Sequence, residues 1–176
     1  MQINTYNNFY NIYFNSSEFN EVFNRAMDLL NETKKIFFIG NGGSNSICSH
    51  MMQDFAKIAK FQTYSFSNPS LITCFSNDFG YENAISEWLE IHFDKNDLLV
   101  AISSSGNSQN ILNAVEKAHA KFGKVITLSG FKEDNNLRYL GNENFFLNIE
   151  NYGVVECFHQ VILHAMLDEY ITRVNE

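Results

Sequence analysis

Two runs of consecutive apolar residues stand out along the chain, and each one ends in a turn of small polar residues. Residues 36–39 run into Gly40-Asn41-Gly42-Gly43-Ser44, and residues 98–102 run into Ser103–Ser108. Unbroken apolar runs of this length predict strands that are buried on both faces of a parallel sheet. The segments that follow, 45–60 and 109–122, contain neither glycine nor proline and predict helices.

The remaining pattern predicts more strands and helices in alternation. Residues 63–66, 125–129 and 145–149 predict strands, and residues 84–93 and 154–173 have helical spacing. Asn68-Pro69-Ser70 predicts a turn, and a short helix is expected near Leu137. Strands that alternate with helices predict a three-layer α/β fold: a doubly wound, mostly parallel five-stranded sheet flanked by helices.

The N-terminal segment is rich in aromatic residues. Residues 3–14 fit either a helix or an extended aromatic arm, and residues 18–30 predict an amphipathic helix that Ser16 or Ser17 caps. One small sheet cannot cover so many aromatic side chains, so we expect residues 1–33 to pack against another subunit.

Composition narrows the class of protein. The 176 residues are enough for one domain, 1–176, and they carry a net charge of −8 without a Lys/Arg cluster, which argues against binding to nucleic acid or to an anionic membrane. No apolar run approaches the length of a membrane span, so we expect a cytoplasmic protein. The three cysteines are expected to be free thiols.

The two polar loops predict a binding site for an anion. Parallel strands present such loops at their carboxyl ends, where unpaired N–H groups of the next helix and the helix dipole favour a negative ligand. The first loop has Asn45 in place of the third glycine of a dinucleotide-binding motif and lacks the Gly-Lys-Ser/Thr of a triphosphate-binding loop. We therefore expect no nucleotide cofactor.

Three motifs in this order resemble the sugar isomerase (SIS) domain, and within it the phosphoheptose isomerases. The motifs are Gly40-Asn41-Gly42-Gly43-Ser44, Asn77-Asp78-Phe79-Gly80-Tyr81 and Ile102–Ser108. The resemblance covers nearly the whole chain. It implies interconversion of sedoheptulose 7-phosphate and a heptose 7-phosphate, which would serve the synthesis of lipopolysaccharide or capsule. It also implies a homotetramer with active sites at subunit interfaces.

The same resemblance assigns a phosphate and sugar site to the two loops. The second loop would hold the phosphate and the first would line the sugar, while Asp78 either binds sugar hydroxyls or caps the next helix. The residues expected to bind the substrate are Asn41, Gly42, Gly43, Ser44, Asp78, Ser103, Ser104, Ser105 and Ser108.

Isomerisation of a sugar also needs acids and bases. His50 and Asp54 are four residues apart and share a helix face. The resemblance places His and Glu at these two positions, and Gln and His at the positions of Glu156 and His164, so Asp54 and Glu156 are departures from the family. We expect Asp54, Glu156 and His164 to be catalytic, with His159 in a supporting position.

These residues also suit a metal ion. His50, Asp54, Glu156 and His164 would form a set of two imidazoles and two carboxylates, which are ligands that Zn²⁺ accepts. Some members of the family hold zinc at this place, so one Zn²⁺ per subunit is one alternative. The other is an acid–base cluster without metal.

Other functions remain open at this point. The chain could isomerise a different sugar phosphate, because both departures lie where substrate carbons would sit. It could also be a SIS protein without catalysis, either a sensor of phosphorylated sugars or a scaffold that binds another protein. A generic α/β domain with unrelated Gly/Ser turns is the remaining alternative.

Overall fold

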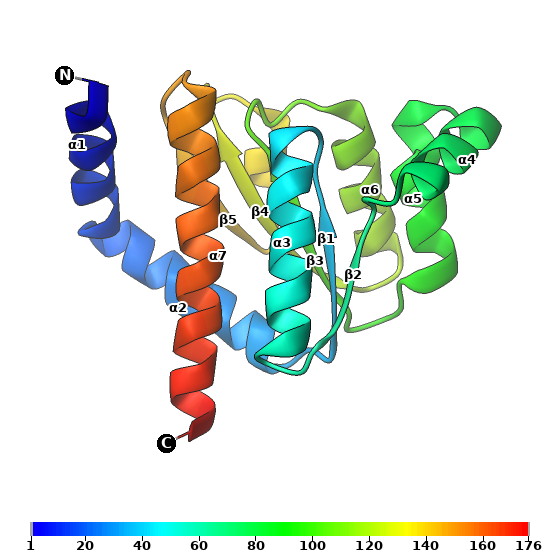
Figure 1. Ribbon diagram of the computed structural model, residues 1–176, viewed down its shortest axis with the longest axis horizontal. Helices are drawn as coiled ribbons and strands as arrows, with labels where there is room; N and C mark the ends of the chain where they lie inside the picture. The colour runs from blue at the N-terminus through cyan, green and yellow to red at the C-terminus, as the bar shows by residue number, and fades with distance from the viewer. Residues whose placement is uncertain (1, 176) are drawn as a thin grey trace.

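A five-stranded parallel sheet forms the middle layer of the computed structural model, which describes residues 2–175 (Figure 1). The order of the strands is β2-β1-β3-β4-β5, and every neighbouring pair is parallel. This confirms the predicted doubly wound α/β fold. Residues 1 and 176 of the predicted domain lie outside the described range. The strands are β1 (Lys35–Ile39), β2 (Gln62–Ser65), β3 (Leu98–Ser103), β4 (Lys124–Gly130) and β5 (Glu143–Leu147).

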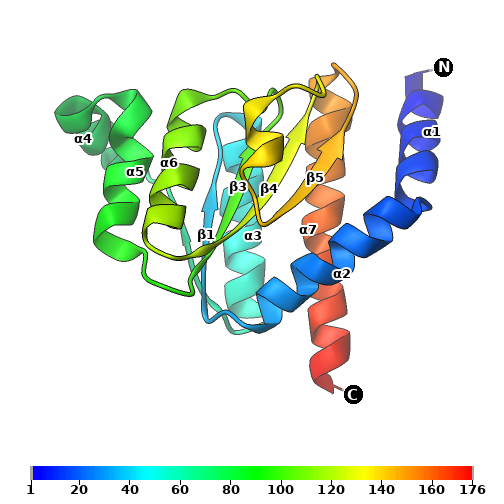
Figure 2. The same ribbon diagram turned by 180° about the vertical axis from the view of Figure 1, so that it is seen from behind.

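Helices cover both faces of the sheet. One face carries α2 (Ser17–Asn31), α3 (Gly43–Lys57) and α7 (Tyr152–Asn175), with α1 (Gln2–Phe14) standing at the outer edge (Figure 1). The other face carries four elements, which Figure 2 shows from behind. They are α4 (Pro69–Phe79), α5 (Tyr81–His92), α6 (Gln109–Ala120) and the 3₁₀ helix η1 (Asn136–Tyr139).

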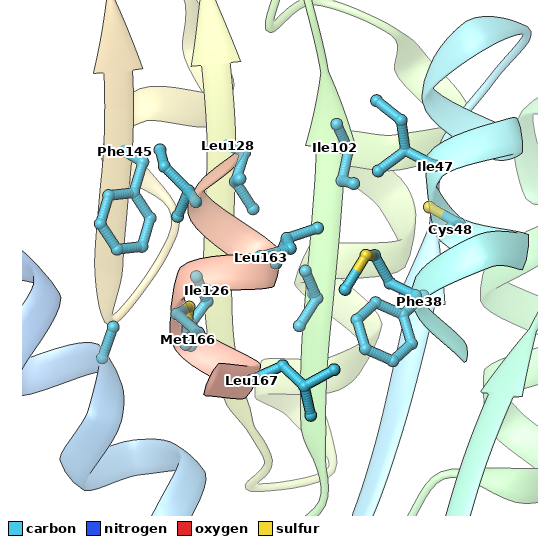
Figure 3. Close-up of a cluster of buried hydrophobic side chains, with 14 of the residues drawn as sticks. Phe38, Ile47, Cys48, Ile102, Ile126, Leu128, Phe145, Leu163, Met166 and Leu167 are labelled. Atoms are coloured by element: carbon cyan, nitrogen blue, oxygen red, sulfur yellow. The ribbon is translucent and has the colours of Figure 1, made fainter. Parts of the chain in front are cut away.

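Alternation along β1 divides its side chains between two cores. Ile36 and Phe38 point into the cluster shared with α3 and α7, whereas Phe37 and Ile39 point into the cluster beneath α5 and α6. Figure 3 shows the first cluster, where Leu163 of α7 faces the central strands. A strand that is buried on both faces needs an unbroken apolar run, which is the pattern that predicted β1.

The N-terminal segment is helical rather than an extended arm. The rings of Tyr13 and Phe14 lie 4.6 and 5.4 Å from the ring of Phe158 on α7, so α1 packs on the last helix through aromatic contacts. Ser16 caps α2, because its Oγ accepts a hydrogen bond from the N–H of Phe19 at 3.1 Å. Among the helices described over residues 2–175, none combines the length and apolarity that a bilayer crossing needs.

The predicted turn at Asn68-Pro69-Ser70 is wrong. This segment starts α4: Asn68 is its N-cap, and the side chain accepts hydrogen bonds from the N–H groups of Ser70 and Leu71 at 2.9 and 3.2 Å. Proline suits the first position of a helix, where its missing N–H costs nothing. Asn-Pro therefore marks a helix start here.

Candidate functional site

Two strand-to-helix loops meet at the carboxyl edge of the sheet. The first joins β1 to α3 and the second joins β3 to α6, and the two strands are neighbours from which the chain winds in opposite directions. Ligands of open α/β sheets bind at this kind of position. A pocket between the loops, which we call the anion pocket, is lined by Asn41, Gly42, Gly43, Ser44, Ile102, Ser103, Ser104, Ser105, Ser108, Tyr152 and Glu156. The structure thus brings together all the residues predicted to bind phosphate or sugar except Asp78.

The loop between β3 and α6, residues 103–108, which we call the serine loop, is held in place by hydrogen bonds within it and to β4. The Oγ hydroxyl of Ser103 donates to the Oγ of Ser108 at 3.2 Å, and the N–H of Gly130 donates to the carbonyl of Ser104 at 3.0 Å. Ser108 is the N-cap of α6, but its side chain makes no capping hydrogen bond. Hydroxyls and N–H groups at this helix start therefore have capacity for a ligand.

Asn41 supports the first loop. Its side-chain oxygen accepts hydrogen bonds from Asn110 Nδ2 and Tyr81 Oη, both at 2.8 Å, and its Nδ2 donates to Asn110 Oδ1 at 2.9 Å. Asn110 is buried. The Asn41 amide is thus largely used within the protein, and its role is to fix the loop against α5 and α6.

Asp78 lies away from the pocket. It is exposed near the end of α4, where its Oδ1 accepts a hydrogen bond from Asn77 at 2.9 Å. The next helix, α5, has Gly80 as its N-cap and no side-chain capping bond, so the alternative role as a cap is not seen either.

A second group of candidate residues lies farther along α3 and α7. The Nε2 of His50 is 3.2 Å from Oδ2 of Asp54, and the ring of His164 lies 5.3 Å from the ring of His50. One ligand atom of each of these three residues lies within 4.8 Å of the others. We call them the His/Asp cluster. Two imidazole nitrogens and a carboxylate fit Zn²⁺, which binds such donors with one position left open in catalytic sites.

Glu156 is separate from this cluster. It lies in the first turns of α7 and lines the anion pocket, and a Cβ added to Gly43 would collide with its carboxylate. Eight residues separate it from His164 on the same helix, a rise of about 12 Å. The structure therefore does not bring Glu156 into the predicted set of metal ligands.

His159 is enclosed in the core. Its Nε2 donates to the carbonyl of Ser129 at 3.3 Å, and burial lowers the pKa of His159 to about 4. Because the ring is fully buried, it does not face the His/Asp cluster or the anion pocket as a reactive group.

Sequence reasoning missed three residues at the site. Tyr152 lines the anion pocket, and Asn110 and Tyr81 hold Asn41. Tyr81 belongs to a motif that was noted, but its partner lies forty residues earlier in the chain. No local spacing signals that contact.

Comparison with known proteins finds relatives over most of the chain. A family model, described as the SIS domain, matches residues 14–130. A phosphoheptose isomerase of Fusobacterium nucleatum subsp. nucleatum is 31% identical over 156 residues, which are 86% of this chain and 80% of the relative. One of Aeromonas salmonicida is 32% identical over 148 residues, which are 80% of this chain and 76% of the relative.

Solved structures show the same fold. The phosphoheptose isomerase structure from Neisseria gonorrhoeae has a TM-score of 0.77 at 25% identity and covers 86% of each chain. One from Francisella tularensis has a TM-score of 0.85 and covers 98% of this chain and 95% of the other, at 22% identity. The chain belongs to the SIS-domain family and, within it, to the phosphoheptose isomerases.

Proposed function

We propose that the protein is an aldose–ketose isomerase that interconverts sedoheptulose 7-phosphate and glycero-manno-heptose 7-phosphate. The observation that carries this proposal is the placement of an anion pocket and a His/Asp cluster on the same pair of helices. Helices α3 and α7 start at the carboxyl edge of the sheet and run side by side in the same direction (Figure 1). A substrate held by its phosphate at the helix starts can extend along them toward the cluster.

The separation of the two groups suits a seven-carbon sugar. Six residues separate Ser44 in the anion pocket from His50, which corresponds to a rise of about 9 Å along α3. An extended chain from C1 to C7 has six carbon–carbon bonds and spans about 7.5 Å at ordinary bond lengths and angles, before the phosphate is counted. The carbonyl end of a heptose 7-phosphate therefore reaches the cluster while its phosphate stays in the pocket.

Each member of the cluster has a role in proton transfer. Asp54 takes a proton from C1 of the ketose while His164 supplies one to the oxygen on C2, which gives the enediol; removal of the proton on O1 and return of a proton to C2 give the aldose. The other Asp54 oxygen, Oδ2, faces His50 at 3.2 Å, so His50 orients the carboxylate. Glu156, the other carboxylate considered as a base, lies at the phosphate end.

The same cluster suits one Zn²⁺ per subunit. His50, Asp54 and His164 would hold the ion, and their donor atoms are of the types zinc prefers. When bound, Zn²⁺ supplies Lewis acidity toward an oxygen of the reacting carbons. A nitrogen or oxygen atom that holds the ion cannot also transfer a proton, so the proton-transfer roles given above apply to the cluster without metal.

The biological setting follows from the product. A heptose 7-phosphate made in the cytoplasm would enter the synthesis of lipopolysaccharide, capsule or another glycan. We further propose a homotetramer with the active sites at subunit interfaces, because His50 and the aromatic residues of α1 are exposed or only partly buried in the single chain.

The test is turnover of sedoheptulose 7-phosphate, followed by NMR detection of the aldose in chelator-treated and metal-supplemented protein. We expect turnover, and a difference between the two samples if the cluster needs metal. His164→Ala and Asp54→Asn should each lower kcat by about 10²–10⁴-fold with phosphate binding retained. The matched controls are His92→Ala and Asp28→Asn, which change exposed residues outside both groups and should leave turnover unchanged.

Full activity in His164→Ala would remove His164 from the mechanism. If the wild-type protein binds sugar phosphates but turns none over, the proposal of this reaction is wrong, and a different sugar or a sensor of phosphorylated sugars takes its place.

A further inference from the structure

The anion pocket contains a carboxylate without a partner. Glu156 lines it beside the serine loop and is only half-buried. Among residues 2–175, no hydrogen bond or ion pair is made by the Glu156 side chain, and no Lys or Arg lines the pocket. A site for a dianionic phosphate ester thus carries a negative charge of its own with no neighbouring cation to offset it.

The position of this carboxylate explains why it is tolerated. Both Glu156 oxygens occupy the space that a side chain at position 43 would need, since a Cβ added to Gly43 would come within 2.6 Å of Oε2. Gly43 is the first residue of α3, and the N-cap, Gly42, has no side chain to satisfy the N–H groups there. A negative charge at a helix N-terminus is favourable because it meets unpaired N–H groups and the positive end of the helix dipole. The Glu156 carboxylate lies beside this helix start without a hydrogen bond to its N–H groups among residues 2–175, so the helix dipole is what favours its charge there.

We propose that Glu156 limits the affinity of the site, because its carboxylate lies in the same pocket as the phosphate of the ligand and repels it. This rests on the proposed function only in taking the pocket as the phosphate site. The ligand must share the pocket with a like charge. Substrate and product carry the same phosphate, so the effect is equal on both and on the transition state, and it sets KM rather than kcat.

Binding of inorganic phosphate tests this without any need for turnover. In calorimetric titrations at one pH and 0.15 M salt, Glu156→Gln should lower the dissociation constant for inorganic phosphate about tenfold, since the amide keeps the shape and removes the repulsion. The control is Glu21→Gln, which makes the same change in net charge at an exposed position on α2, outside the pocket. At this ionic strength a charge far from the ligand is largely screened, so Glu21→Gln should leave the constant unchanged.

Kinetics give a second readout. With sedoheptulose 7-phosphate, Glu156→Gln should lower KM by a similar factor and leave kcat within about twofold, as expected for a uniform change in binding. Tighter phosphate binding without turnover in either protein would support this inference while contradicting the proposed function. If Glu156→Gln lowered kcat and left the dissociation constant for inorganic phosphate unchanged, the inference would be overturned and Glu156 would be a catalytic residue.

Magnesium separates charge repulsion from metal bridging. Mg²⁺ is often held between a protein carboxylate and a substrate phosphate. If added Mg²⁺ tightens phosphate binding to the wild-type protein but not to Glu156→Gln, the carboxylate is a metal ligand and the proposal is wrong. An equal response of both proteins supports repulsion by the carboxylate.

Discussion

His159 lies on the inner side of α7, where burial lowers its pKa to about 4. The carbonyl of Ser129 can only accept a hydrogen bond, so the ring carries its hydrogen on Nε2, and Nδ1 has no partner among the described residues. A ring that stays neutral well below pH 7 cannot supply protons at the active site. His159 therefore supports the end of β4, next to the serine loop, through its hydrogen bond.

This burial predicts a dependence of stability on pH. The unfolded chain takes up a proton on His159 near pH 6.5 and the folded protein only near pH 4, so the contribution of this residue to the free energy of unfolding is lost as the pH falls between these values. The full loss is on the order of 3 kcal/mol. In urea unfolding at pH 7 and pH 5, His159→Gln should lose less stability on acidification than the wild-type protein.

The matched control for this measurement is the exposed His92. His92→Gln should show the wild-type difference between pH 7 and pH 5, because the exposed ring of His92 lacks the burial that acts on His159. If the wild-type protein and His159→Gln lost the same free energy of unfolding between pH 7 and pH 5, the assignment of this pH dependence to His159 would be contradicted.

Sequence patterns identified some site residues and missed others for a physical reason. Ser103 and Ser108 belong to one turn, so a local motif predicts them. Asn110 reaches Asn41 across the space between two loops, and Tyr152 joins the pocket from the last helix. Contacts between distant segments leave no spacing in the sequence. The separation of Glu156 from His164 is different, because the rise of about 12 Å between these two positions of one helix follows from the sequence spacing alone.

Helix α4 depends strongly on local interactions. None of its residues is buried, and its partly buried Leu71, Ile72 and Phe75 pack against the core beneath α5. Its first N–H groups are satisfied by the Asn68 side chain. A short helix with little buried surface opens more readily than the core.

Removal of this cap should loosen α4 selectively. Asn68→Ala should cost about 1 kcal/mol of local stability, because two N–H groups lose their acceptor. Hydrogen exchange should become faster over α4 and stay unchanged in β3, which is buried throughout. Asn68→Asp retains an acceptor and should exchange like the wild-type protein. If β3 also exchanged faster in Asn68→Ala, α4 would not be a separate local unit.

At the same scale, the strands were predictable and the boundaries of some helices were not. The apolar runs of β1 and β3 are long because both faces of these strands are covered. The helix predicted from Asn45 begins at Gly43 instead. Glycine suits this first turn because the Glu156 side chain occupies the space that a Cβ at position 43 would need.

Over the whole molecule, α1 and α4 stand at opposite ends (Figures 1 and 2). Helix α1 leaves Ile3 and Ile12 exposed by 63% and 75%, beside aromatic residues that are only partly covered. Apolar side chains gathered in this way favour contact with another chain. This is the surface on which the proposed tetramer would depend.

A charge on this surface should weaken assembly. In sedimentation experiments we expect the wild-type protein at about four times the chain mass of 20.3 kDa, and Ile12→Glu at a lower mass with unchanged helical circular dichroism, because burial of an unpaired carboxylate is unfavourable. Ile91→Glu changes a similarly exposed residue, 67% accessible, on α5 and should keep the wild-type mass. A monomeric wild-type protein would contradict the tetramer.

The start of α7 is fixed by two close approaches, one to each side of the pocket. Glu156 rests on Gly43, and a Cβ at Gly130 would come within 2.7 Å of the methyl groups of Val155. His164 is carried by the same rigid helix, so its place relative to the phosphate is set by contacts two turns away. In the proposed function, discrimination between sugars of different length would then depend on how the two helices are offset. Gly130 is outside the lining of the pocket, so a larger residue there would act on His164 only through the position of α7.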